Sequence, residues 1–241
     1  MLSGFPTVFG INPLKTSANP LHDLGTVGVT ADGRTFRYAK AGGTALSQGQ
    51  LQIMADTVAN HDDMATNTAA AGAKEVTVTL GATTVTAGEY ADGYLVINDD
   101  TGEGTTYRVD TVPASAGTED VVVVLKDALR EAFGAGTTAT LIRNPYAAVL
   151  VSDGTQTDTA VGVPITDVTA SYYCWLQTRG ICSVLADTGA QPSAGSPITI
   201  GDTTTGGVEA RNAAGEVYLG MGLKGHTYTS GEYEPVLLQI D

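Results

Sequence analysis

The chain has 241 residues, 30 of them glycine, and its 26 Asp and Glu against 12 Lys and Arg give a formal charge of −14. Such a surface repels phosphate backbones and anionic lipid headgroups, so we expect neither nucleic acid nor a membrane among its partners. Many Gly, Thr and Val residues with few Lys and Arg favour strands and turns. We therefore expect an all-β fold, a β-sandwich or barrel of many short antiparallel strands with little helix.

Residues 1–24 predict an extended N-terminal arm. Apolar side chains alternate there with three prolines, a mixture too broken for a helix and too apolar for an idle tail. The arm is expected to dock either on its own body or on a neighbouring subunit. Its candidate partner-contacting residues are Phe5, Pro6, Phe9, Ile11 and Leu14. The first residues also lack the basic and continuous apolar regions of a signal peptide, which favours an intracellular, soluble product.

A hairpin is predicted next, with strands at 26–30 and 35–39 around the turn Ala31-Asp32-Gly33-Arg34. Residues 44–71 contain helix-forming Ala and Met, but Gly49 and several Thr residues oppose a long helix. We favour strands and loops there, with room for one short helix.

The middle of the chain alternates apolar and polar residues in the way of half-buried strands. The predicted strands are 75–80, 94–98, 105–110, 121–125 and 138–142, and the segment KDALREAF at 126–133 is the clearest candidate for a short helix. Short strands follow at similar intervals to the C-terminus. This pattern predicts an arm at 1–24, a main β domain at 25–71 and 146–241, and an inserted β subdomain at 72–145.

The two cysteines, Cys174 and Cys182, lie in the segments SYYCWLQT and ICSVLA. An Arg179-Gly180 turn would make these segments a hairpin and put the two thiols on opposite faces of it. We therefore expect no disulfide.

No sequence pattern indicates catalysis. The three histidines have no metal-ligand spacing, and glycine motifs for phosphate or dinucleotide binding are missing. His61-Asp62-Asp63 could contribute to a cation or acid/base site with a distant partner, but a solvated polar loop is the favoured interpretation. The glycine-dense stretch 220–226 indicates a bulge or a close backbone approach. We predict no catalytic, cofactor-binding or metal-binding residues, and a protein that is not an enzyme.

Several segments together resemble capsid decoration (cement) or minor head proteins of tailed bacteriophages. They are HDLGTVGVTADGRTFRYAKAGGTAL at 22–46, VANHDD at 58–63, EVTVTLGATTVTAGEYADGYLVIND at 75–99, IRNPY at 142–146, YYCWLQTRG at 172–180, YLGMGL at 218–223 and EYEPVLLQID at 232–241. The resemblance implies a structural virion protein, made in the host cytoplasm, that binds the outer capsid surface and holds neighbouring major capsid proteins together. It also implies a homo-oligomer, with a trimer favoured over a dimer, and no active site.

Two alternatives stay open at this stage. A head-fibre or tail component that binds host glycans would need surface aromatics and could also use calcium-binding carboxylates. A β-fold glycan hydrolase would need two carboxylates converging at roughly 5 to 9 Å in a cleft, and nothing in the sequence identifies such a pair.

Overall fold

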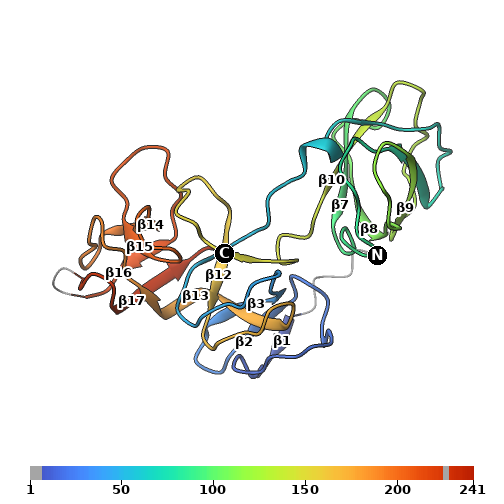
Figure 1. The fold of residues 1–241 in the computed structure, drawn as a ribbon. Helices are drawn as coiled ribbons and strands as arrows, with labels where there is room; N and C mark the ends of the chain where they lie inside the picture. The colour runs from blue at the N-terminus through green and yellow to red at the C-terminus, as the bar shows by residue number, and fades with distance from the viewer. Residues whose placement is uncertain (1–6, 225–227) are drawn as a thin grey trace. The chain divides into compact units, whose positions relative to one another are not determined.

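The computed structural model describes residues 7–224 and 228–241, and the chain divides into two compact units (Figure 1). The body unit comprises Met1–Ala55 and Pro145–Asp241, and the inserted unit comprises Asp56–Asn144. Both units are built from strands, as expected. Among the described residues, the only helix is one 3-10 turn, Ala59–His61.

The inserted unit forms a nearly closed barrel-like sheet of six antiparallel strands in the order β5-β10-β7-β8-β9-β6. A bridge between Thr66 and Val78 brings the two edges together. The alternating residues of its strands face a single core, in which Val76 and Val78 are completely buried. The strands are β5 (Met64–Ala65), β6 (Glu75–Thr79), β7 (Tyr94–Asp99), β8 (Thr106–Thr111), β9 (Asp120–Leu125) and β10 (Thr138–Ile142).

Two expectations about this unit differ from the structure. It begins at Asp56 rather than at residue 72, because β5 pairs with β10 and belongs to the barrel. The prediction of a short helix at 126–133 is wrong. Leu129 and Phe133 are buried there, and their N–H groups donate to the carbonyls of Ala73 and Ala69, so the backbone follows the neighbouring segment.

The body unit is organised around one sheet with the strand order β1-β2-β3-β13-β17-β16-β14-β15, to which β12, β4 and β11 attach. Its strands are β1 (Thr7–Phe9), β2 (Val27–Val29), β3 (Thr35–Lys40), β4 (Gln52–Ile53), β11 (Leu150–Val151), β12 (Ala160–Pro164), β13 (Tyr173–Leu185), β14 (Pro197–Ile200), β15 (Val208–Ala210), β16 (Gly220–Gly222) and β17 (Tyr233–Gln239). The predicted hairpin at 26–39 is present as β2 and β3.

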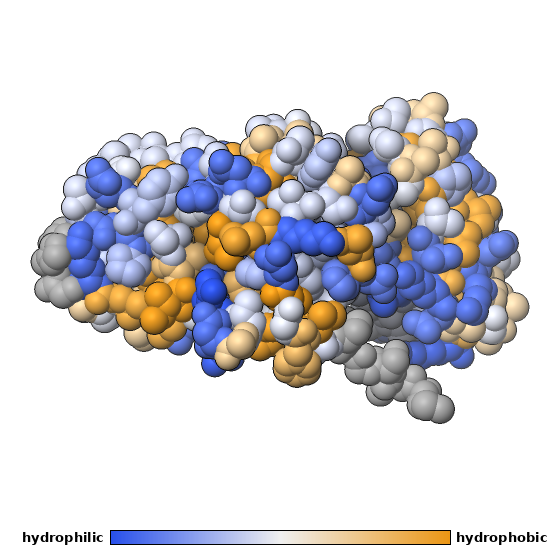
Figure 2. Space-filling model, turned by 90° about the horizontal axis from the view of Figure 1, so that it is seen from below, coloured by the Kyte–Doolittle hydropathy of each residue, from blue (hydrophilic) through white to orange (hydrophobic). Residues whose placement is uncertain are grey.

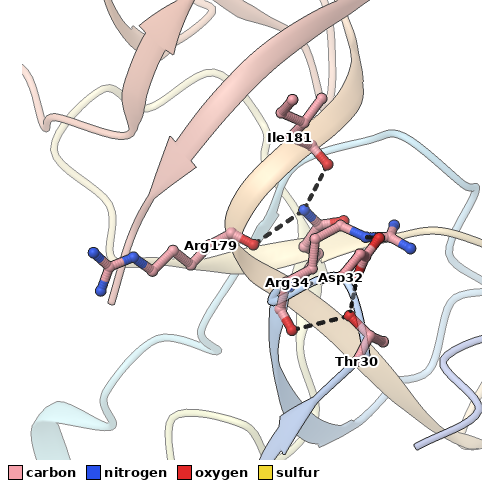
Figure 3. Close-up of polar contacts among 6 residues, drawn as sticks. Thr30, Asp32, Arg34, Arg179 and Ile181 are labelled. Atoms are coloured by element: carbon pink, nitrogen blue, oxygen red, sulfur yellow. Dashed lines mark hydrogen bonds and ion pairs between the residues drawn. The ribbon is translucent and has the colours of Figure 1, made fainter. Parts of the chain in front are cut away.

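The prediction of a hairpin around Arg179-Gly180 is wrong, because β13 continues through these residues as one strand of 13 residues. Residues 173–179 pair with β3 and residues 179–185 pair with β17, with an irregular register between Gln177 and Arg179. The Gln177 Nε2 donates to the carbonyls of Arg179 and Ile181 and so supports the irregular backbone (Figure 3). Gly180, at φ +94°, gives the strand a bend rather than a reversal.

A compact turn packs beside this bend. The Thr30 hydroxyl and the Arg34 guanidinium both donate to the Asp32 carboxylate, at 2.5 and 2.8 Å (Figure 3). The Arg34 side chain covers Gly180, where an added Cβ would lie 2.9 Å from the Arg34 Cγ. The β13 bend is therefore held from within by Gln177 and from outside by the turn of the first hairpin.

The described part of the N-terminal arm lies on its own body. Strand β1 pairs in parallel with β2, and Ser17 forms a bridge with Tyr173. Ile11 packs against the buried cluster of Phe36, Tyr38 and Trp175. Of the two docking modes considered for the arm, residues 7–24 thus use the intramolecular one.

Candidate functional site

A row of apolar side chains crosses the outer face of the body sheet. In register, Ile181 of β13 is opposite Leu237 of β17, Leu237 is opposite Met221 of β16, and Met221 is opposite Pro197 of β14. Directly paired residues project from the same face of a sheet. These four residues, which we call the apolar row, therefore form a continuous line over four adjacent strands.

The apolar row faces solvent although its neighbours in sequence form a core. Ile181 is 63% exposed and Met221 40% exposed, whereas Cys182, Val236 and Ile198 on the opposite face are buried. Leu223, directly after β16, and Tyr233, at the start of β17, add further exposed apolar surface. A contiguous exposed apolar patch is typical of an interaction surface.

The surface also carries hydrophobic groups in the view from below (Figure 2). Figure 2 shows hydrophobic residues gathered in separate groups between hydrophilic ones. One group lies toward the left of the view, the side on which Figure 1 places β16 and β17.

The five predicted contact residues of the arm fall into three groups according to where they lie. Phe9 and Leu14 are 77% and 60% exposed and are accessible to a partner. Ile11 packs into the core of its own body instead. Phe5 and Pro6 lie outside the described residues.

A second feature of the body unit is a group of three carboxylates, Asp187, Asp202 and Glu209, which we call the carboxylate cluster. One oxygen from each side chain lies within 4.8 Å of the others. Asp187 follows β13, Asp202 follows β14, and Glu209 is in the middle of β15. Asp187 and Glu209 are buried, whereas Asp202 is exposed.

The hydrogen bonds of Asp187 and Glu209 differ. Burial opposes the charge of Asp187, but the backbone N–H groups of Thr204, Gly189 and Thr203 donate to its carboxylate and hold its pKa below the usual value. Burial raises the pKa of Glu209. The Ala190 N–H lowers it in part, while the negative charges of Asp202 and Asp187 raise it further. Three oxygen donors of this kind could hold a hard cation such as Ca²⁺.

The sequence did not indicate this cluster, because its members are far apart in the chain and only the fold brings them together. The one local signal was an Asp close to the end of each of two predicted strands, Asp187 directly after the first and Asp202 one residue beyond the second. Glu209 gave no signal, since one acidic residue in a short strand normally faces solvent.

The His61-Asp62-Asp63 motif is divided by the structure. Asp62 and Asp63 are exposed, in line with a polar loop. His61, in contrast, is completely buried, with Nδ1 at 2.5 Å from the Tyr90 hydroxyl and Nε2 at 3.1 Å from the Thr83 carbonyl. Both ring nitrogens therefore have partners within the inserted unit, and His61 has a structural environment.

The close backbone approach expected in the glycine-dense stretch is present. A Cβ on Gly220 would lie 2.0 Å from the Leu237 carbonyl oxygen, and one on Gly222 would lie 2.5 Å from that of Ser193. These glycines allow β16 to fit between β17 and β14 and so position Met221 in the apolar row.

Comparisons with known proteins identify no relative. No family model matches the chain, and no curated protein or solved structure matches it either. In the part of the chain that the structure describes, no helix has the length and hydrophobicity needed to cross a membrane.

Proposed function

We propose that this protein is a capsid decoration (cement) protein, which binds the outer surface of a tailed-bacteriophage capsid and stabilises contacts between major capsid proteins. The observation that carries the proposal is the apolar row. Burial of apolar surface contributes about 25 cal/mol per Å², so these side chains would gain free energy by contact with a neighbouring protein. The binding would be strengthened by repetition, because a capsid offers many equivalent sites and the protein is proposed to form a homo-oligomer, a trimer rather than a dimer.

Charge and the arm support the same proposal. A chain with a formal charge of −14 suits the outside of a shell, away from packaged DNA. Phe9 and Leu14 add exposed apolar side chains at the edge of the body sheet, where β1 is the last strand. We propose that the apolar row and these exposed residues of the arm both contact the shell.

The proposal includes no catalytic role. A thiol nucleophile must be accessible and ionised, but Cys174 and Cys182 are buried and burial raises the pKa of each thiol to about 12. His61 is enclosed between Tyr90 and Thr83. These groups thus have the environment of structural residues rather than of a nucleophile or a general base.

The direct test is co-sedimentation of the purified protein with phage heads that lack it, followed by heating of decorated and bare heads side by side. We expect saturable binding and a higher temperature of shell rupture for the decorated heads. The variant Ile181→Asp should weaken binding, because it places a charge in the apolar row. Val122→Asp is the matched control, since Val122 is an exposed strand residue of the inserted unit. Absence of binding to any head, or equal binding by both variants, would contradict the proposal.

A head-fibre or tail component that binds host glycans is the second candidate, and exposed tyrosines are the observation in its favour. Tyr233 is exposed at the start of β17, and Tyr218 is exposed with its hydroxyl bonded to Gln239 at the other end. Six residues of strand separate these positions by about 20 Å, so the two rings do not form one stacking platform for a sugar. Saturable binding to host glycans, combined with no binding to heads, would favour this candidate.

A further inference from the structure

The carboxylate cluster brings three negative charges together without a described cationic side chain in an ion pair with any of them. None of the ion pairs among the described residues includes Asp187, Asp202 or Glu209. Burying a carboxylate without a positive partner is costly, and here two buried carboxylates and a third exposed one converge within 4.8 Å. A bound cation would remove this cost.

The backbone approaches the three carboxylates closely at Gly189. A Cβ added to Gly189 would lie 2.7 Å from the Glu209 Oε2 and 3.6 Å from both the Asp187 Oδ1 and the Asp202 Oδ1. Apart from Gly189 and its chain neighbours, these three oxygens are the nearest heavy atoms to that point. A side chain at position 189 would therefore crowd one oxygen from each carboxylate, and glycine lets the three groups converge.

An independent observation at the same place is the Thr199 hydroxyl. Thr199 is completely buried, and its Oγ1 has no hydrogen-bond partner. It pairs directly with Glu209 across β14 and β15, so the two side chains project from the same face. Gly201 directly follows β14, and the Asp187 carboxylate lies over it, since an added Cβ there would be 2.1 Å from the Asp187 Oδ2. The unpartnered hydroxyl thus belongs to a residue directly beside Glu209, on the same face of the sheet.

We propose that Asp187, Asp202 and Glu209 bind a divalent cation, with the Thr199 hydroxyl as a neutral oxygen donor that acts directly or through one water. All donors are oxygens, which favours Ca²⁺ or Mg²⁺ over transition metals, and Ca²⁺ is favoured because it tolerates flexible geometry whereas Mg²⁺ requires near-ideal octahedral coordination. The cation joins the ends of β13 and β14 to β15. The proposal concerns the isolated chain and is independent of the proposed capsid binding.

The test is isothermal titration calorimetry of the full chain, first freed of metal with a chelator, with CaCl₂ and with MgCl₂. We expect one saturable Ca²⁺ site and weaker Mg²⁺ binding. Asp202→Asn removes one charge from an exposed side chain and should raise the Kd for Ca²⁺ about 10-fold or more. Asp99→Asn is the control, because Asp99 is an exposed carboxylate of the inserted unit and its loss should leave the Kd unchanged.

Two further variants separate cation binding from folding. Gly189→Ala places a methyl group 2.7 Å from the Glu209 Oε2, which displaces this oxygen without changing any charge and should weaken Ca²⁺ binding about 10-fold or more. Thr199→Val removes only the unpartnered hydroxyl, so it should weaken Ca²⁺ binding while leaving the thermal midpoint in chelator unchanged or higher. No saturable Ca²⁺ binding by the unaltered chain, or wild-type affinity in both Asp202→Asn and Gly189→Ala, would overturn the proposal.

Discussion

Trp175 of β13 is directly opposite Tyr38 of β3, and the two rings meet edge to face with their centroids 5.1 Å apart. The indole of Trp175 also covers Gly28 of β2. This contact joins the first hairpin, the arm and the longest strand, because Ile11 packs on the same rings.

We predict that Gly28→Ala destabilises the body unit. The added Cβ would lie 2.6 Å from the Trp175 Cζ3 and 2.7 Å from the Ile11 Cδ1, and no heavy atoms approach so closely without displacement. Overpacking of this kind costs about 1 to 3 kcal/mol. The free energy of unfolding in urea measures the effect. Gly43→Ala is the matched control, since an added Cβ there meets no atom within 4 Å.

The raised pKa of Glu209 gives a pH dependence with a definite sign. Burial and the charges of Asp202 and Asp187 disfavour the ionised form, so the folded state binds the proton more tightly than the unfolded state. The stability that this proton contributes is fully present below the unfolded pKa of about 4.5 and is lost as the pH rises through the higher folded pKa.

We therefore predict that Glu209→Gln, which has no proton to lose, becomes more stable relative to the wild type as the pH rises from 4 to 7 in the presence of a chelator. The expected sign is fixed by the direction of the Glu209 pKa shift, and the gain should grow steadily over this pH range. Urea unfolding at several pH values measures the difference. Parallel pH profiles of the two proteins would contradict the prediction, and saturating Ca²⁺ should reverse the order of stability if the cation site is present.

Much of the fold could be predicted because strand patterns are local. Alternation in residues 75–79 places Val76 and Val78 on one face, and the same rule identifies β7 to β10. The bend at Gly180 could not be predicted in this way, since Arg-Gly between two apolar runs has the composition of a two-residue turn. Only the pairing of both halves of β13 with different strands shows that the chain continues.

The candidate sites were harder to predict, because each depends on contacts distant in sequence. Ile181 and Met221 resemble ordinary core residues of apolar strands, and their exposure follows from the register with Leu237. Asp187 and Glu209 converge only because the end of β13 lies beside β15, where the Asp187 N–H donates to the Val208 carbonyl.

The absence of a disulfide was predicted from a hairpin that does not exist, so it needs a test of its own. Cys174 and Cys182 are free in the structure and belong to separate core clusters. Burial raises the pKa of both thiols to about 12, which leaves a thiolate fraction of roughly 10⁻⁴ at pH 8. We predict that neither thiol reacts with Ellman's reagent in the native protein and that both react in concentrated guanidinium chloride without prior reduction. Only one or no reactive thiol after unfolding would show that a disulfide forms.

The irregular part of β13 depends on the Gln177 side chain. Its Nε2 donates to the carbonyls of Arg179 and Ile181 at 3.1 and 2.9 Å, whereas its buried Oε1 has no partner. We predict that Gln177→Leu lowers the free energy of unfolding by about 1 to 3 kcal/mol, because two carbonyls near the bend lose their donor. Gln48→Leu is the control, since Gln48 is exposed. Equal stability of both variants in urea would mean that Gly180 and the strand pairing alone hold the bend. A loss of stability in Gln177→Leu but not in Gln48→Leu would show that the Gln177 amide supports the bend. This bend allows β13 to pair first with β3 and then with β17.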